Sequence, residues 1–421
     1  MSAPSAYVFI ELQGAAVPVG RLFGRSMRGR EGATFEYSPD WLNHPERFAL
    51  EPGLTLGPAP HHTAAGRALF GAFGDSAPDR WGRNLINHAE RRKALAEKRA
   101  PRTLREIDYL LGVSDEARPG ALRFKTVPDG SFLAAGGEEP IPPLLALPKL
   151  LNASVRFEKD EETAEDLRLL LAPGSSLGGA RPKASVKDVS GRLFLAKFPS
   201  VQDGHDVIRW EAVTLSLAAK AGISASAGKL VKTAGRPVLL LERFDRRGRE
   251  RTPFLSAMSL LGAADRETYS YLEIAEALRR HGAAVAQDLP ELWRRMVFNV
   301  LVSNTDDHLR NHGFLYAGPK GWRLSPAYDM NPTPADIGPR RLATTITLDH
   351  DPTASLDLAL EVARDFTLSA SKAKAVAAEV GRAVGGWRKE AAAVRLDKAA
   401  IERMATAFEH EDARKARKTS T

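Results

Sequence analysis

The sequence predicts an α+β fold, and three observations lead to that class. Short strand patterns separated by turn residues fill residues 7–60, a second strand-containing segment begins near Leu171, and helical periodicity dominates after Arg251. Strands and helices in separate runs are typical of α+β architecture. The chain has 421 residues, enough for two or three domains, and we expect a β-rich subdomain over 1–125, a mixed α/β lobe over 126–250 and a helical lobe over 251–421.

The N-terminal part begins with strand signals. Residues 7–12 and 17–22 flank a turn at Gly14, which predicts a hairpin, and residues 35–37 are a third candidate strand. From residue 64 to 111 the pattern becomes helical, with Pro78 and Pro101 near the expected helix starts. Residues 126–147 are rich in Pro, Gly and Ala, so we expect a linker or a long loop there.

The rest of the chain combines strand patterns with longer helical ones. We expect strands near 183–186, 193–198 and 237–244, and a helix over 208–220 that ends at Gly222. Between residues 291 and 304 the apolar side chains recur on one helix face, which predicts a packed helix. Residues 313–324 have a hairpin pattern, and residues 355–414 are helical.

The composition excludes several kinds of site. There are no cysteines, which excludes disulfides, zinc–thiolate centres and cysteine nucleophiles. The formal net charge of +8 suits nucleic acid, nucleotide phosphates or an acidic partner, or simply a solvated basic surface. We find no zinc-finger spacing and no clear helix-turn-helix pattern, so we do not expect this chain alone to recognise a DNA sequence. The first residues lack signal-peptide features and no apolar run is long enough to span a bilayer, so we expect a cytoplasmic protein.

The polar stretch from Asn304 to Asn311 carries the strongest chemical signal. Asp306 and Asn311 have the D-x-x-x-x-N spacing of a kinase catalytic loop, and Asp329 follows after the expected hairpin. Asp306 would accept or orient the proton of a substrate hydroxyl, while Asn311 and Asp329 offer oxygen ligands to magnesium. The pattern therefore predicts phosphoryl transfer from ATP. Turn-capping residues and a metal-dependent hydrolase are the alternative interpretations.

Two other residues of this stretch, and the histidine that follows it, have polar side chains. Asp307 is adjacent to Asp306, and neither residue type nor spacing decides which of the two is the base. We expect His308 to hold the loop rather than to act as the catalyst, because phosphoryl transfer needs no imidazole. We expect His312 to be a surface histidine.

A lysine and a glycine-containing loop are candidates for binding phosphates. Lys197 lies in the expected strand 193–198, where its ammonium group can contact phosphates with Glu211 as its partner, although Asp203 and Asp206 also lie nearby. A lysine on a solvent face of the strand is the alternative. The loop from 175 to 183 can present backbone N–H groups to phosphates. It matches no standard phosphate-loop pattern, so a flexible surface loop is the alternative.

The segment Glu242–Asp245 follows a buried strand and precedes the helical region. In a two-lobed kinase the lobes connect at this point, and backbone groups there bind adenine. Phe244 would pack on the base, or it belongs to the core, which is the commoner position for an aromatic side chain.

Taken together, these motifs resemble the HipA family of serine/threonine kinase toxins from bacterial type II toxin–antitoxin modules. The resemblance covers nearly the whole chain. It implies a two-lobed, protein-kinase-like (HipA-like) fold with an extra β-rich N-terminal subdomain, a mixed α/β ATP-binding N-lobe and a mostly helical catalytic C-lobe. The matching segments are Asn304–Asn311 (N-x-D-x-H-x-x-N), Tyr328-Asp329 (Y-D), Leu195–Pro199 (the lysine strand), Glu242–Asp245 (E-R-F-D), Ser176–Lys183 (S-x-x-G-A-x-x-K) and Pro78–Arg83 in the N-terminal subdomain.

The resemblance also implies a role for each matched residue. Asp306 is the catalytic aspartate, and Asn311 and Asp329 hold Mg2+. Ser176 is the residue that members autophosphorylate to inactivate themselves, with the adjacent Ser175 as the alternative. The residues implied to bind ATP are Lys197, Lys183, Ser176, Gly178, Gly179, Ala180, Glu242, Phe244, Asp245 and His308.

Cofactors and partners follow from the same resemblance. It implies ATP and Mg2+, a protein substrate that is an aminoacyl-tRNA synthetase, a small helix-turn-helix antitoxin (HipB-like), and operator DNA contacted through the complex. Two features depart from the family pattern: Asp307 replaces a small residue, and Arg181-Pro182 makes the phosphate loop stiffer and more basic. A small-molecule (antibiotic-type) phosphotransferase and an ATP-binding, non-catalytic corepressor are the alternative functions.

Overall fold

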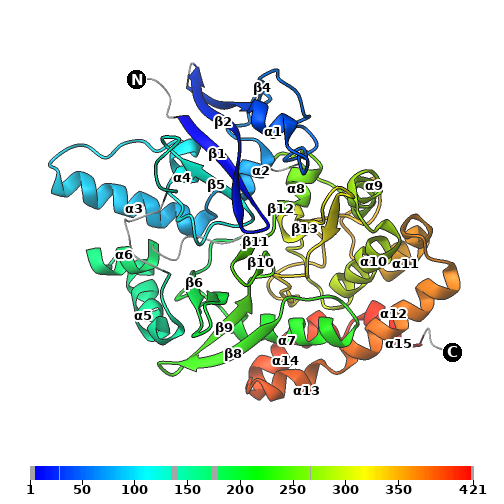
Figure 1. Ribbon diagram of the computed structural model, residues 1–421. Coiled ribbons are helices and arrows are strands. Elements are labelled where there is room, and N and C mark those ends of the chain that lie inside the picture. The colour runs from blue at the N-terminus through cyan, green and yellow to red at the C-terminus, as the bar shows by residue number, and fades with distance from the viewer. Residues whose placement is uncertain (1–4, 28, 134–140, 172–178, 266, 419–421) are drawn as a thin grey trace. The chain divides into compact units, whose positions relative to one another are not determined.

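The computed structural model describes residues 5–27, 29–133, 141–171, 179–265 and 267–418. The chain divides into two compact units, whose helices and strands are labelled in Figure 1. Unit 1 contains residues 1–201 and 232–264, and unit 2 contains residues 202–231 and 265–421. The finer division at residues 125 and 250 stays a prediction.

Unit 1 begins with an antiparallel sheet in the order β4-β3-β2-β1-β5. β1 (Ser5–Leu12) and β2 (Ala15–Met27) form the expected hairpin, and Gln13 and Gly14 at its turn have φ of +49° and +80°, as a tight two-residue turn requires. Alternate residues of β1, Ala6, Val8 and Ile10, are buried. The other strands are β3 (Arg30–Tyr37), β4 (His61–His62) and β5 (Leu122–Lys125).

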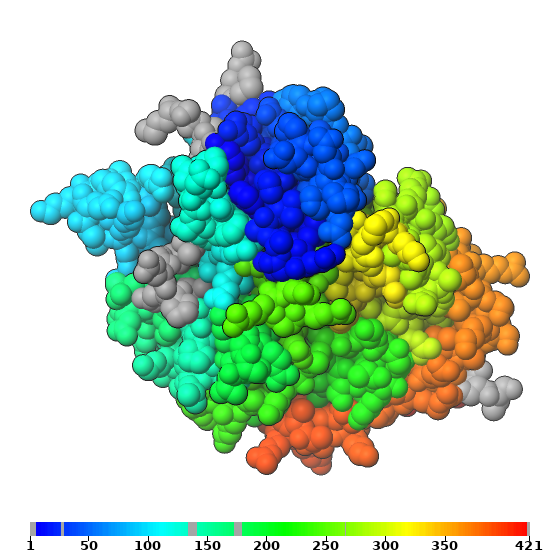
Figure 2. All heavy atoms as spheres, viewed as in Figure 1, coloured from blue at the N-terminus to red at the C-terminus, as the bar shows by residue number. Residues whose placement is uncertain are grey.

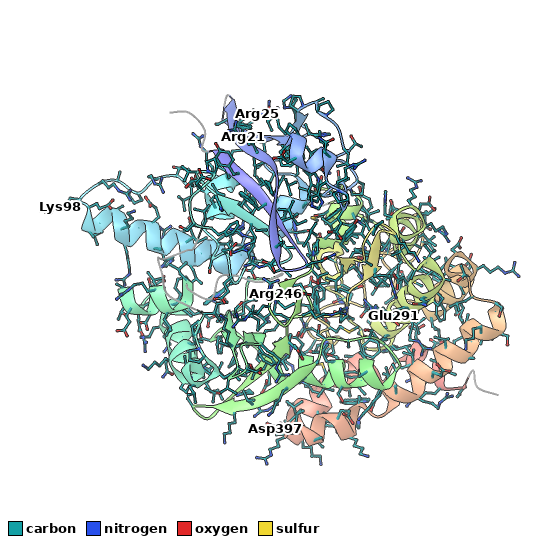
Figure 3. All side chains as sticks on the ribbon, in the orientation of Figure 1. Arg21, Arg25, Lys98, Arg246, Glu291 and Asp397 are labelled. Carbon is teal, nitrogen blue, oxygen red and sulfur yellow. The ribbon has the colours of Figure 1, made fainter. Side chains whose placement is uncertain are left out.

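The helices of unit 1 are only partly those that we expected. α3 (Arg80–Ala96) starts just after Pro78, where the Asp79 side chain caps it by accepting from the Gly82 amide. Its far end stands out from unit 1, with Lys98 at the tip (Figures 2 and 3). Two of the longer helices were not expected, α5 (Leu147–Glu158) and α6 (Ala164–Leu171). The shorter helices are α1 (Pro39–Asn43), α2 (Gly71–Asp75), α4 (Glu106–Leu111), α8 (Ala257–Leu260) and the 3-10 turn η1 (Leu144–Ala146).

A second antiparallel sheet of unit 1 carries the candidate nucleotide-binding residues. Its strands β6 (Lys183–Lys187), β7 (Leu193–Lys197) and β9 (Arg236–Glu242) lie in that order, with the central β7 pairing both neighbours. β8 (Gly228–Thr233) runs across the boundary between the units and was not expected. The short strands β10 (Arg246–Arg247), β11 (Glu250–Arg251) and β12 (Phe254–Ser256) follow.

Unit 2 is mostly helical, as expected, and is built around α10 (Val285–Leu301). The apolar face predicted for this helix is fully buried, from Leu292 to Leu301, and it packs against α9 (Tyr271–His281) and α12 (Ala370–Gly385). The remaining elements are α7 (Val207–Lys220), η2 (Leu309–Asn311), β13 (Gly313–Tyr316), β14 (Trp322–Leu324), α11 (Leu356–Glu361), η3 (Val362–Phe366), α13 (Trp387–Ala393), α14 (Lys398–Phe408) and α15 (Glu411–Lys418). Within the described ranges, none of the helices has both the length and the apolar character needed to cross a bilayer.

Candidate active site

The end of α10 fixes the start of the polar loop. The Asn304 amide donates to the Asn299 carbonyl at 2.9 Å, and its side-chain nitrogen donates to Asn299 Oδ1 at 3.1 Å. Ser303 has φ of +52° and turns the chain out of the helix, while its hydroxyl donates to the Ala407 carbonyl at 2.9 Å. The loop therefore leaves the core from a position that is held by α10 and α14.

The two adjacent aspartates of the loop have opposite environments. Asp306 is exposed, whereas Asp307 is only 4% exposed. The Asp306 carbonyl accepts hydrogen bonds from the His308 amide at 2.9 Å and from Asn311 Nδ2 at 3.0 Å. Asn311 therefore fixes the peptide group of Asp306, and the exposed Asp306 carboxylate suits a group that meets a substrate hydroxyl.

Asp307 belongs to a buried hydrogen-bond network. Its Oδ2 accepts from the Tyr271 hydroxyl and lies 3.0 Å from His312 Nε2, and Asn299 Nδ2 donates to the same tyrosine hydroxyl at 2.9 Å. Burial raises the pKa of Asp307, but the charge and hydrogen bond of His312 and the bond from Tyr271 outweigh it and hold the pKa below its usual value. With its carboxylate buried and engaged in this way, Asp307 is not the candidate base.

The expectation that His312 is a surface histidine is wrong. The residue is 3% exposed, and the Tyr271 ring meets it edge-on, with 5.3 Å between the ring centroids. His312 is buried because Asp307 supplies a charged acceptor for its ring nitrogen, which offsets the loss of water around the imidazole.

The residues expected to hold magnesium fit that ion. Asn311 Oδ1 is buried and has no hydrogen-bond partner among the described residues, so a neutral oxygen ligand is available while Nδ2 anchors the loop. Asp329 follows Tyr328, whose hydroxyl donates to the Arg310 carbonyl at 2.6 Å and so ties the Asp329 segment to the loop. Asp329 has φ of +56°, and its Oδ1 accepts from Asn331 Nδ2 at 3.2 Å.

Two lysines lie opposite each other at the end of the second sheet of unit 1. Lys183 of β6 is the direct cross-strand partner of Lys197 of β7, so both side chains leave the same face of the sheet. Like charges in this arrangement repel unless anions balance them. Asp79 supplies one carboxylate, with its Oδ2 2.5 Å from Lys183 Nζ, and the Gly179 carbonyl accepts from the same ammonium group at 3.2 Å. Binding of phosphate groups by these two lysines stays a prediction.

The Glu242–Asp245 segment is held by its charged residues. Asp245 is fully buried, and its carboxylate accepts from Arg243, from Arg246 (labelled in Figure 3) and from the Gly120 amide at 2.8 Å. Any contact of Asp245 with adenine would therefore involve its backbone. Glu242 is exposed, and Phe244 is half-buried with its ring centroid 6.2 Å from that of Phe254.

The roles of several predicted site residues stay predictions. Ser175, Ser176 and Gly178 lie outside the described residues. Gly179, with φ of +95°, and Ala180 are exposed at the end of the loop.

His308 is half-buried, and its Nδ1 has no hydrogen-bond partner within the described part of the chain. Glu211 is buried on α7 in unit 2 whereas Lys197 belongs to unit 1, so their pairing also stays a prediction.

A separate group of three possible metal ligands lies in unit 1. The ligand atoms of His88, Asp160 and Glu162 lie within 4.8 Å of one another. His88 Nδ1 is 3.0 Å from Glu162 Oε1, and Arg92 Nε is 3.8 Å from the same oxygen. Arg92 already balances the Glu162 carboxylate, so we assign no metal to this group.

Sequence reasoning did not identify the residues that support the site. It assigned no role to Asp79, although its position just before the expected helix is typical of a capping residue. It also passed over Asn331, whose Oδ1 is buried without a hydrogen-bond partner in the described ranges, and Tyr271, which lies 36 residues before Asp307. The Asp-x-Asn spacing of 329 and 331 offered a second local signal, whereas Tyr271 had none.

Comparisons with known proteins found a matching family model and similar proteins. Residues 175–387, about half of the chain, match the HipA-like C-terminal domain family. The putative kinase Y4mE of Sinorhizobium fredii is 25% identical over 370 residues, which cover 78% of this chain and 80% of that protein. A putative kinase of Haemophilus influenzae is 25% identical over 210 residues, or 44% of this chain and 61% of that protein.

A solved structure of HipA from Shewanella oneidensis MR-1, in complex with HipB and its operator DNA, is similar over nearly the whole chain. The TM-score is 0.63 at 17% identity, and the match covers 98% of this chain and 96% of that one. The likeness confirms the α+β, kinase-like fold expected from the sequence.

Proposed function

Because the chain belongs to the HipA family, we propose that it is an ATP- and Mg2+-dependent protein serine/threonine kinase. One observation carries the proposal. The exposed Asp306 is held by the Asn311 amide, whose buried oxygen has no hydrogen-bond partner among the described residues. A candidate proton acceptor and a candidate metal ligand are thus fixed on one short loop, as phosphoryl transfer requires.

The chain's own residues would act by binding and orientation. Asp306 accepts the hydrogen bond of a serine or threonine hydroxyl and directs its oxygen towards the γ-phosphate. Lys197 and Lys183 bind phosphate oxygens, and the backbone of Glu242–Asp245 binds adenine. Asn311 and Asp329 hold Mg2+, which when bound supplies positive charge to the phosphates.

We extend the proposal to a toxin of a type II toxin–antitoxin module in the cytoplasm. The protein substrate is an aminoacyl-tRNA synthetase, whose phosphorylation stops translation, and autophosphorylation of Ser176 inactivates the kinase. The partner is a small HipB-like antitoxin, with operator DNA bound through the complex. Support comes from the family match and from the fold likeness to a HipA that was solved with HipB and operator DNA.

The first test is intact-mass analysis with site mapping after the phosphatase-treated protein is incubated with Mg-ATP. We expect phosphate on Ser176 in the wild type and none in the Asp306→Asn variant, because the amide keeps the shape of the side chain but cannot accept the hydroxyl proton. Phosphate on both proteins would show that Asp306 is not needed. Phosphate on neither, with ATP still bound, would exclude autophosphorylation and favour a kinase that acts only on other proteins, or the corepressor.

A further inference from the structure

We propose that Asp307 is a positioning residue: its buried carboxylate anchors the loop that carries Asp306, and the rate of phosphoryl transfer depends on that anchor. The inference rests on the proposed function, because it assigns a role within the same site. It is suggested by the buried hydrogen bonds of the Asp307 side chain, directly beside the exposed Asp306.

The anchor joins several elements of unit 2 through one oxygen atom. Asp307 Oδ2 accepts from Tyr271, the first residue of α9, and from His312, the residue just before β13. Tyr271 in turn accepts from Asn299 of α10 at 2.9 Å, and the two residues are 0% and 1% exposed. Buried networks whose members are all satisfied are rigid, since each lost bond leaves a polar group without water.

The main chain of Asp307 is held as firmly as its side chain. The Asp307 carbonyl accepts from Thr344 Oγ1 at 2.6 Å, and the preceding Asp306 carbonyl accepts from Asn311 Nδ2 at 3.0 Å. The peptide groups on both sides of Asp307 are therefore fixed, which restricts where the Asp306 carboxylate can lie. A misplacement of about 1 Å at a reacting group can slow a reaction roughly a hundredfold.

Asp307, Tyr271 and His312 form a set that a small residue at position 307 could not complete. Without the carboxylate, the tyrosine hydroxyl would lose an acceptor and the imidazole would lose its charged partner, both inside the protein. Because unpaired buried polar groups are unfavourable, the loop would move to bring water or another acceptor to them. Asp306 would move with it.

The test compares Asp307→Ala and Asp307→Asn with the control Asp288→Ala. Asp288 is buried to a similar degree, 3% against 4% exposed, and lies at the other end of α10, where it binds Arg323 at 2.9 Å. The rate of autophosphorylation in a single turnover is measured at saturating Mg-ATP. The affinity for Mg-ATP is measured by calorimetry. We expect Asp307→Ala to be about tenfold to a hundredfold slower, with the affinity changed less than about threefold.

Asp307→Asn should recover much of the rate, because its amide oxygen can accept the same two hydrogen bonds. Asp288→Ala should keep a rate near that of the wild type. A wild-type rate in Asp307→Ala, or an equal loss in Asp288→Ala, would overturn the positioning role.

A second readout separates this inference from the proposed function. If the wild type binds Mg-ATP but transfers no phosphate, the proposed function fails, and amide hydrogen exchange still tests the anchor. The His308 and Asn311 amides donate to loop carbonyls at 2.9 and 2.8 Å. Their exchange should be roughly tenfold faster in Asp307→Ala than in Asp288→Ala, and equal exchange would contradict the anchor.

Discussion

At the scale of single residues, Asp306 and Asp307 differ through their surroundings. Asp306 is exposed to solvent, while Asp307 is buried and its pKa is held low by His312 and Tyr271 despite the opposing effect of burial. Spacing in the sequence could not decide which of the two carboxylates is the candidate base. The structure distinguishes them by burial, because Asp307 is 4% exposed and Asp306 is exposed.

Asn311 offers a test of the proposed metal site. Its Oδ1 is buried without a hydrogen-bond partner in the described ranges, so we expect Asn311→Ala to weaken Mg2+ binding, measured by calorimetry in the presence of ADP, by about tenfold. Asn152→Ala, an exposed change on α5, should bind Mg2+ as the wild type does. Unaltered Mg2+ affinity in Asn311→Ala would exclude this oxygen as a ligand.

At the scale of elements, the Glu242–Asp245 segment depends on its buried charges. We expect Asp245→Asn to lower the free energy of unfolding by about 3–5 kcal/mol, because Arg243 and Arg246 would lose their buried anion. For a unit of this size that corresponds to roughly 10 °C in the melting temperature, measured by calorimetry. Glu250→Gln, an exposed change on nearby β11, should shift the melting temperature little.

The stability of the Asp245→Asn variant should also depend on pH differently from that of the wild type. The pKa of Asp245 is lowered, because the nearby guanidinium groups outweigh the effect of burial. Its contribution to stability is therefore present above the unfolded pKa of about 3.9 and is lost as the pH falls below it. As the pH falls below about 4, the melting temperature of Asp245→Asn should fall less than that of the wild type. An equal fall in both proteins would contradict the role of this carboxylate.

The elements that the sequence predicted well are those with a strong local pattern. The β1–β2 and β13–β14 hairpins, α7 and the buried face of α10 lie where turn residues and periodicity placed them. α10 begins at Val285, six residues earlier than the predicted start at 291, because the helix includes Pro290 rather than beginning after it. α5 was missed although Leu147, Leu150, Leu151 and Phe157 follow a helical spacing.

The supporting residues of the site could not be found from local patterns. The Lys183–Lys197 pairing depends on the register of two strands, and the Tyr271–Asp307 bond joins residues that are far apart in the chain. His312 looked like a surface residue because the acceptor that keeps it buried lies five residues earlier, inside a motif interpreted as catalytic. The candidate catalytic and metal-binding residues could be identified from sequence motifs. The residues that hold them in place depend on tertiary packing, which the motifs do not show.

At the scale of the whole molecule, the excess of positive charge bears on DNA binding. The chain has 60 Lys and Arg against 52 Asp and Glu, which leaves a net charge of +8. Many basic side chains are already paired, such as Arg99 with Glu90 and Lys415 with Asp357. The net excess attracts phosphates without regard to base sequence, so in the proposed complex the sequence preference must come from the antitoxin.

We therefore expect the chain alone to bind duplex DNA weakly and without sequence preference. Fluorescence anisotropy with two duplexes of unrelated sequence, one of them the operator of the proposed module, should give affinities within about threefold of each other. For about four phosphate contacts, raising the salt from about 50 to 200 mM should weaken both affinities on the order of a hundredfold, because counterions compete for the phosphates. Addition of the helix-turn-helix antitoxin should create the preference for operator. A preference shown by the chain alone at the higher salt would mean that its own side chains read the bases.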